Sequence, residues 1–166
     1  GEKFFSAGWD LKAVDEGETA DADYGVGGFG GLQELPNMNK PIISAVNGIA
    51  CGGGFEIMIS ADIIIAADHA TFALPEINVG VIADAATIKL RRRIPYHVAV
   101  EFLMTGRWMD VKEAKHWGLV NEIVDKALEM QLEAISITDH EYLTVPKKTD
   151  GIEIIQGIEV SANWDE

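Results

Sequence analysis

Three consecutive glycines, Gly52 to Gly54, constrain the fold of this chain more than any other feature. The apolar run from Pro41 to Val46 predicts a buried strand, and residues 53–60 predict a helix that starts at the glycines. Glycine has no Cβ, and the first N–H groups of a helix have no partner inside it. This junction can therefore present bare donors to a developing negative charge. Glu56 lies one turn into the otherwise apolar helix, and the combination suggests an enzyme.

Short apolar runs alternate with helical patterns along the rest of the chain. Asp84 and Asp110 are candidate N-caps, and Gly106 and Gly118 are expected to end helices. Strands separated by helices indicate an α/β fold with at least partly parallel pairing. The expected strands are 41–46, 63–67, 71–74 and 119–124, with a strand end at Phe4 and Phe5, and the expected helices are 31–38, 53–60, 84–93, 97–105, 111–117 and 127–137.

The segment 13–31 is acidic and then glycine-rich, and is expected to be a mobile loop. Within it, Gly25 to Gly30 matches the dinucleotide-binding pattern GxGxxG. We reject this match because no strand pattern precedes the glycines and no amphipathic helix begins at them.

Length and charge limit the classes of protein to which the chain can belong. Its 166 residues are enough for one domain, and the net charge of −14 argues against a nucleic-acid partner. The sequence has no apolar run of membrane-spanning length and no signal-peptide pattern, so no membrane partner is expected. The single cysteine, Cys51, favours a reducing, cytoplasmic location. The four histidines show no metal-binding spacing, so no metal site is expected.

Two carboxylates, Glu56 and Glu76, lie in apolar surroundings next to glycine or proline junctions. The helix–strand–strand path between them can return Glu76 to the mouth of the glycine junction. Two partly desolvated carboxyl groups hold their pKa values apart, which suits the addition of water across a double bond. In the equally weighted alternative, Glu76 caps a turn and Glu56 lies on a wet helix face.

Several ordered motifs resemble the crotonase (enoyl-CoA hydratase/isomerase) superfamily over residues 1–125, whereas residues 126–166 form a divergent or truncated C-terminal segment. Within the superfamily, the forms of residues 8–12, 27–32 and 54–56 are similar to the carnitinyl-CoA dehydratase (crotonobetainyl-CoA hydratase) branch. The motifs are Phe5 to Lys12, Lys40–Pro41 through Gly48, Gly52 to Glu56, Ala61–Asp62, Phe72 to Glu76, Gly80, Met104 to Arg107, Glu113–Ala114 and Trp117 to Asn121.

The resemblance implies a spiral of ββα units that assembles as a homotrimer or homohexamer. It also implies an oxyanion hole formed by the backbone N–H groups of Trp9 and Gly53. Glu56 would activate the water that attacks C3, and Glu76 would exchange the proton at C2. No cofactor is bound permanently, because coenzyme A is part of the acyl-CoA substrate. The residues implied to bind the CoA substrate are Ala7, Trp9, Asp10, Leu11, Lys12 and Gly53.

The expected activity is the reversible hydration of a short enoyl-CoA to a 3-hydroxyacyl-CoA, with crotonobetainyl-CoA and carnitinyl-CoA as the favoured pair. Two alternatives remain: an enoyl-CoA isomerase that uses mainly Glu76, and a non-catalytic CoA-binding or assembly subunit. Two departures from the family pattern motivate the second alternative. The family's N-terminal strands have no counterpart before Gly1, and residues 81–87 lack the usual proline and glycines beside Glu76.

Overall fold

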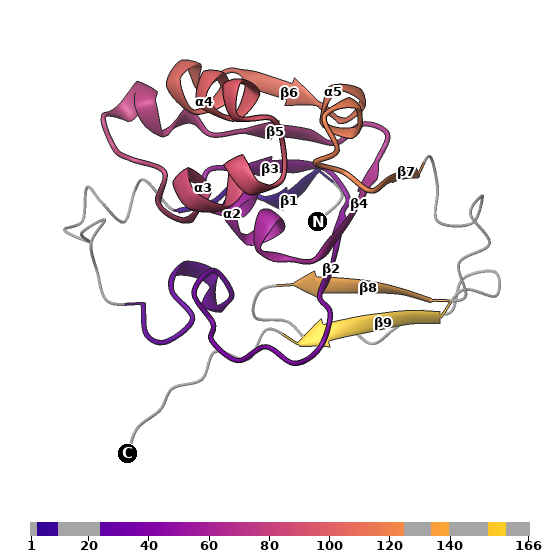
Figure 1. The fold of residues 1–166 in the computed structure, drawn as a ribbon. Helices are drawn as coiled ribbons and strands as arrows, with labels where there is room; N and C mark the ends of the chain where they lie inside the picture. Colours follow the sequence, from indigo (N-terminus) through magenta and orange to yellow (C-terminus); the bar gives the residue numbers. More distant parts are fainter. Residues whose placement is uncertain (1–2, 10–23, 125–133, 140–152, 159–166) are drawn as a thin grey trace.

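The computed structural model describes residues 3–9, 24–124, 134–139 and 153–158. Their strands form three sheets in the orders β1-β3-β5-β6, β2-β4-β7 and β8-β9, and every pairing is parallel except that of β5 with β6 (Figure 1). The strands are β1 (Phe4–Ser6), β2 (Ile43–Val46), β3 (Ile49–Cys51), β4 (Ile63–Ala67), β5 (Thr71–Ala73), β6 (Trp108–Asp110), β7 (Glu122–Val124), β8 (Ala134–Asp139) and β9 (Glu153–Ile158).

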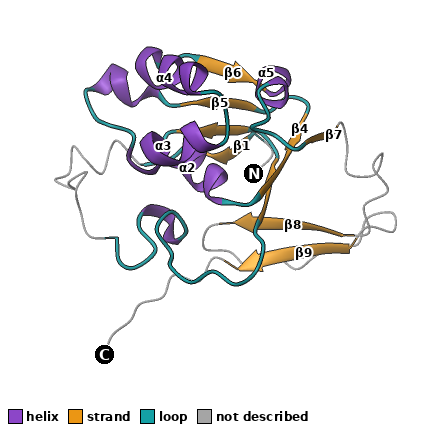
Figure 2. Cartoon of the chain, in the orientation of Figure 1, coloured by secondary structure: helices purple, strands orange, loops and turns teal. Residues whose placement is uncertain are grey.

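Short helices connect and cover these strands (Figure 2). Helix α2 follows β3 directly and packs beside α3, while α4 packs near the turns η2 and η3. The α-helices are α2 (Gly53–Ser60), α3 (Asp84–Lys89), α4 (Tyr96–Thr105) and α5 (Val111–His116), and the 3₁₀ turns are η1 (Phe29–Gly31), η2 (Pro75–Val79) and η3 (Leu90–Arg92).

The chain advances by a repeated pair of strands followed by a helical segment. Strands β2 and β3 belong to different sheets and lead into α2, and β4 and β5 then pair in parallel with β2 and β3 before η2 and α3. The circuit from β2 and β3 to β4 and β5 adds one parallel strand to each of these two sheets, and parallel neighbours require a crossover connection, which α2 provides here. This arrangement confirms the predicted α/β spiral of ββα units.

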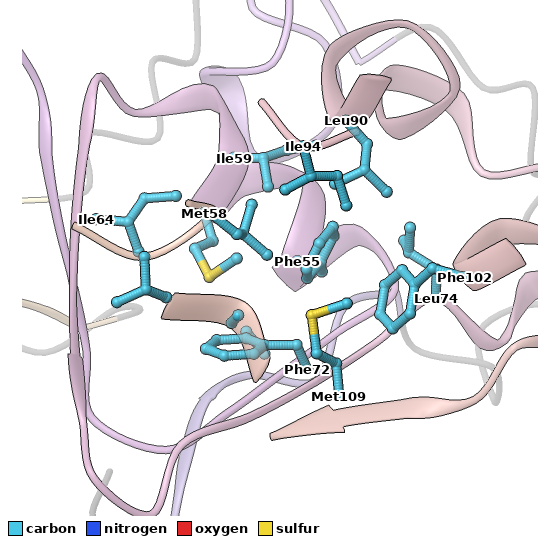
Figure 3. Packing of buried hydrophobic residues seen from close by; sticks show 14 of the residues in the cluster. Phe55, Met58, Ile59, Ile64, Phe72, Leu74, Leu90, Ile94, Phe102 and Met109 are labelled. Atoms are coloured by element: carbon cyan, nitrogen blue, oxygen red, sulfur yellow. The ribbon is translucent and has the colours of Figure 1, made fainter. Parts of the chain in front are cut away.

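The core is built around the apolar face of α2 (Figure 3). Phe55 is completely buried, with its ring centroid 5.5 Å from that of Phe102 and 6.3 Å from that of Phe72. Met58 and Ile59 from the same helix are also buried. Since a fully buried side chain of this size stabilises a protein by about 1.5–3 kcal/mol, the core fixes α2 and the polar residues that it carries.

Several predicted elements are confirmed with small changes at their ends. Helix α4 ends at Gly106, whose φ of 61° lies in the left-handed region. Helix α5 begins after Asp110, whose side chain accepts a hydrogen bond from the Glu113 backbone N–H at 2.8 Å. Gly118, with a φ of 80°, follows that helix closely. These ends were predictable because the signals for them are local.

The strand that enters the three glycines is β3, which the sequence pattern missed. The predicted strand at residues 41–46 is β2, in a different sheet, and Gly48 intervenes. A Cβ at Gly48 would lie 2.4 Å from the Lys3 carbonyl oxygen, so the chain passes very close to β1 at this point. The order of strand, glycines and helix is therefore as predicted, but the strand that leads into the glycines is β3 and not the one predicted at 41–46.

Four other expectations about local structure were wrong or only partly right. Segment 31–38 is irregular after η1, and it contains Pro36, which disfavours a helix. The helix expected over 84–93 ends at Lys89 and continues as η3, and Asp84 is its first residue rather than its N-cap. The strand expected over 119–124 begins at Glu122. Residues 134–137 of the expected helix 127–137 lie in β8, consistent with their alternating isoleucines, and 127–133 lie outside the described residues.

No helix in the part of the chain that the structure describes has the length and apolar character needed to span a bilayer.

Candidate active site

A cavity of about 280 Å³ lies at the N-terminal end of α2. Five separate segments line it: the end of the β1 loop, the loop 24–34, the first turn of α2, η2, and the segment that precedes α3. The structure thus places Trp9, Gly53, Glu56 and Glu76 around one space. The lining residues are Trp9, Tyr24, Gly25, Gly28, Phe29, Gln33, Glu34, Gly53, Glu56, Glu76, Val81, Ile82, Ala83 and Asp84.

Close backbone packing holds the β1 loop against the start of α2. A Cβ at Gly8 would lie 2.7 Å from the Gly53 nitrogen, and a Cβ at Gly54 would lie 2.3 Å from the Ser6 carbonyl oxygen. Real Cβ atoms do not approach other atoms so closely, so both positions require glycine. This packing brings Trp9, the residue after Gly8, to the helix N-terminus, where the first N–H groups have no partner within the helix.

The loop 24–34 packs onto the same end of α2. Gly53 faces the ring of Phe29, because a Cβ at Gly53 would lie 2.4 Å from a ring carbon of Phe29. Gly30 lies equally close to the Ile57 side chain. The glycine-rich segment is a loop, as expected, and its residues 24–31 form one wall of the cavity. Residues 13–23 lie outside the described residues.

Glu56 is buried in the cavity wall, with 5% of its surface exposed. Its Oε1 accepts a hydrogen bond from the Ala86 backbone N–H at 2.8 Å, and its Oε2 accepts one from the Gln33 side-chain amide at 3.4 Å. Burial raises the pKa of Glu56 to about 6, with smaller upward contributions from the charges of Glu76 and Asp84. The two hydrogen bonds favour the carboxylate and oppose this rise in pKa.

Glu76 lies on η2, directly opposite the glycine turn. Its Oε1 is so near Gly52 that a Cβ there would come within 3.1 Å of it. Its Oε2 is buried and has no hydrogen-bond partner among the described residues. Burial raises the pKa of Glu76, and its own backbone N–H opposes this only in part. Burial therefore raises the pKa of both carboxyl groups.

The residues expected to bind CoA are only partly described. Trp9 lines the cavity, and its indole Nε1 is buried without a hydrogen-bond partner in the described part of the chain. Ala7 is exposed and lies outside the cavity lining. Asp10, Leu11 and Lys12 lie outside the described residues, so their role stays a prediction.

Gln33 was not recognised from the sequence as part of the site. Gln33 lay in a segment that was predicted to be helical, and the family-like residues 27–32 just before it were the only available signal. The altered segment 81–87 was expected to bear on the Glu76 side. The segment contacts both acids, because the Val81 N–H donates to the Glu76 backbone oxygen at 3.1 Å and the Ala86 N–H donates to the Glu56 carboxylate.

The cavity has an acidic and aromatic character. Four acids line it, namely Glu34, Glu56, Glu76 and Asp84, while no lysine, arginine or histidine is found among its described lining residues. Within the described ranges, no group of three or more His, Cys, Asp or Glu side chains could hold a metal ion. The site can therefore offer backbone donors, two carboxyl groups in different environments and a negative field.

Comparison with known proteins places the chain in a family. The family model for enoyl-CoA hydratase/isomerase matches residues 1–147, and the chain belongs to that family. The resemblance to the crotonase superfamily is thereby confirmed.

Several relatives that are similar to this chain are carnitinyl-CoA dehydratases. The one from Citrobacter koseri is 54% identical over 127 residues, which cover 76% of this chain and 49% of the relative. The one from Proteus mirabilis is 51% identical over 140 residues, which cover 84% and 53%. The solved carnitinyl-CoA dehydratase from Mycobacterium avium 104 aligns with a TM-score of 0.71 at 38% identity, covering 78% of this chain and 51% of that one. The chain thus spans about half the length of the relatives that it matches.

Proposed function

We propose that the cavity catalyses the reversible hydration of a short enoyl-CoA thioester to a 3-hydroxyacyl-CoA, with crotonobetainyl-CoA and carnitinyl-CoA as the substrate pair. The observation that carries this proposal is the placement of Glu56 and Glu76 in one cavity beside the N-terminus of α2. A hydro-lyase needs a base for water, an acid for the carbon and donors for the thioester oxygen, and this arrangement offers all three.

The backbone N–H groups of Gly53 and Trp9 would form the oxyanion hole. As water adds at C3, negative charge moves to the thioester oxygen, and donors held in place by the fold stabilise the resulting enolate. Gly53 supports this role because it is the first residue of α2, at the positive end of the helix dipole. Removing one such donor typically lowers kcat by about 10²–10³-fold.

The two carboxyl groups would divide the proton transfers. Glu56 has a hydrogen-bond donor on each oxygen, which supports its role as the ionised base that takes a proton from the attacking water. Glu76 has a buried oxygen without a partner among the described residues, which supports its role as the acid that delivers a proton to C2. Dehydration would use the same groups in reverse.

The lining of the cavity supports an acyl group that carries a positive charge. Trp9, Tyr24 and Phe29 offer aromatic surface, and Glu34 and Asp84 add negative charge to the lining besides the two proposed catalytic acids. A trimethylammonium group is attracted both by aromatic faces and by a negative field. The names of the relatives favour the same substrate.

Further parts of the proposal follow from the family resemblance. CoA would enter as part of the substrate, with no permanently bound cofactor, and would lie along Ala7 and residues 9–12. The chain would assemble as a homotrimer or homohexamer in the cytoplasm. Nucleic acid is not proposed as a partner, because the net charge is −14, and no membrane partner is proposed.

The experiment replaces each carboxyl group by its amide, as Glu56→Gln and Glu76→Gln, and follows enoyl-thioester absorbance with crotonobetainyl-CoA and the uncharged crotonyl-CoA. Each variant should lose about 10²–10⁴-fold in turnover, the usual contribution of a positioned acid or base. Glu122→Gln, on an exposed residue of β7, is the matched control. Undiminished turnover in both site variants would exclude the mechanism.

One observation favours a second candidate, an enoyl-CoA isomerase that depends mainly on Glu76. The buried oxygen of Glu76 is well suited to proton exchange beside a thioester, with or without water addition. Solvent deuterium incorporated into substrate without formation of a hydration product would favour the isomerase. Calorimetric binding of an acyl-CoA without either reaction would favour a non-catalytic subunit.

A further inference from the structure

Lys89 on α3 is hydrogen-bonded both to the loop that carries Gln33 and to α2, which carries Glu56. Lys89 Nζ donates a hydrogen bond to the Gln33 backbone oxygen and another to Ser60 Oγ, the latter at 2.8 Å. Ser60 Oγ in turn donates to the Glu56 backbone oxygen at 2.8 Å. Lys89 therefore links the loop that carries Gln33 to the helix that carries Glu56.

The side chain of Gln33 points into this arrangement rather than into solvent. It is buried, with 4% of its surface exposed, and its amide nitrogen lies 3.4 Å from Glu56 Oε2 and 3.5 Å from the Gly53 carbonyl oxygen. Both neighbours are acceptors, so the NH₂ group and not the amide oxygen must face them. The same group thus contacts the proposed base and the residue of the proposed oxyanion hole.

We propose that Gln33 is the positioning residue of Glu56, and that Lys89 holds the Gln33 loop in the place where the amide can act. With Oε1 bound by the Ala86 N–H and Oε2 bound by the Gln33 amide, the plane of the carboxylate is fixed by two donors. A fixed carboxylate can direct one remaining lone pair at a water molecule in the cavity. The expected effect of Gln33 on turnover rests on the proposed function, whereas its expected effect on the pKa of Glu56 does not.

The charges around Glu56 explain why such support matters. Burial disfavours the ionised form of Glu56 most, Glu76 on η2 and Asp84 on α3 add to this effect, and the charge of Lys89 attracts the carboxylate. A neutral amide that donates a stronger hydrogen bond to the carboxylate than to the neutral acid opposes these effects without adding a charge to the cavity.

The first experiment measures the titration of Glu56 directly, by carboxyl ¹³C NMR of the free protein labelled at glutamate Cδ. The Glu56 signal is the one that is absent from Glu56→Gln. Gln33→Met keeps the length of the side chain and removes the donor, so the pKa of Glu56 should rise by about half a unit to one unit. An unchanged pKa in this variant overturns the proposal. If Gln33→Met does not fold, Gln33→Asn, whose shorter amide cannot reach Oε2, takes its place.

The role of Lys89 is tested by a double-mutant cycle with Lys89→Met, and by Lys89→Arg as the variant that retains the charge. Removing the charge raises the pKa of Glu56 by itself, so the informative quantity is the coupling between the two sites. If Lys89 acts through Gln33, Lys89→Met shifts the pKa less in the Gln33→Met background than in the wild type. Strictly additive shifts would overturn the role of Lys89.

The last readout is the pH profile of kcat/KM. Since the proposed base must be ionised, the acid limb should move to higher pH in Gln33→Met by the same shift that NMR records, with kcat falling about tenfold and KM nearly unchanged. A shifted NMR titration with an unshifted limb would leave Gln33 as the partner of Glu56 and exclude Glu56 as the base. An unshifted titration together with an inactive Glu56→Gln would leave Glu56 as the base and exclude Gln33 as its positioning residue.

Discussion

The two walls of the cavity are built in different ways, although each carries one carboxyl group. Glu56 stands on α2, whose other side chains fill the core, and both of its oxygens are hydrogen-bonded. Glu76 stands on the 3₁₀ turn η2, where its neighbours Ile77 and Val79 are 51% and 57% exposed and one of its oxygens has no partner among the described residues. The difference suggests that one wall holds its carboxyl group in a fixed orientation, whereas the other leaves a buried carboxyl oxygen available to a ligand.

The largest expected effect comes from damage to the core below the Glu56 wall. Phe55→Ala removes a completely buried ring between Phe72 and Phe102, and should lower the free energy of unfolding by about 3–5 kcal/mol. Urea unfolding followed by circular dichroism measures this loss. A cost below about 1 kcal/mol would show that α2 does not depend on this core, and would remove the contrast between the two walls.

The next largest effect is a loss of turnover that we expect on substitution of Gly53, the first residue of α2. In Gly53→Ala the new Cβ would overlap the Phe29 ring, so either the ring or the first turn must move. A displacement of about 1 Å at the proposed oxyanion hole can lower turnover by about 10²-fold. The measurement is kcat with an enoyl-CoA thioester.

The double variant Gly53→Ala/Phe29→Ala is the matched control for that prediction. It gives the added methyl group space, so part of the lost turnover should return. If the double variant is as slow as Gly53→Ala alone, the loss does not come from the overlap with the ring.

A third prediction uses the pH dependence of stability. Since burial raises the pKa of Glu56 from its ordinary value of 4.5 to about 6, the native state binds this proton more tightly than the unfolded state does. The stability from this proton is therefore fully present below pH 4.5 and is lost as the pH rises through 6, an effect of about 2 kcal/mol. Glu56→Gln should remove it, so that unfolding in urea at pH 7 requires more denaturant than for the wild type.

The comparison with Glu76→Gln sharpens this third prediction. Burial also raises the pKa of Glu76, so its amide variant should change the pH profile in the same direction. A gain in stability at pH 4.5 as large as that at pH 7 would contradict the linkage for either residue. Such a result would mean that the amide stabilises the protein for reasons unrelated to the proton.

The Glu56 wall could be predicted from the sequence because its signals are local. Three glycines before an apolar helix with one acid identify α2 and Glu56 without any knowledge of the rest of the chain. Strand β3 could not be found in this way, since three residues are too few to show a period. The parallel pairing of β3 with β5 is nevertheless what places η2 and Glu76 opposite the glycines.

The position of Gln33 depends on tertiary packing that leaves little trace in the sequence. The loop fits onto α2 only because Gly30 and Gly53 leave space for Ile57 and Phe29, and this complementarity joins residues more than twenty positions apart. The sequence pattern predicted a helix at Gln33 and a mobile loop before it. The sequence therefore identified both proposed catalytic acids, Glu56 and Glu76, but did not identify Gln33, which is hydrogen-bonded to Glu56.

The smallest expected effect tests the exposed side of the Glu76 wall. Val79 is 57% exposed, so Val79→Ser should change the free energy of unfolding by no more than about 0.5 kcal/mol, in contrast to the several kcal/mol expected for Phe55→Ala. Urea unfolding of the two variants under the same conditions measures both walls on one scale. A loss above about 1 kcal/mol for Val79→Ser would show that another part of the assembled protein covers this side chain in solution. The Glu76 wall would then be as firmly supported as the Glu56 wall, and the unpartnered oxygen of Glu76 would need another explanation than a loosely built turn.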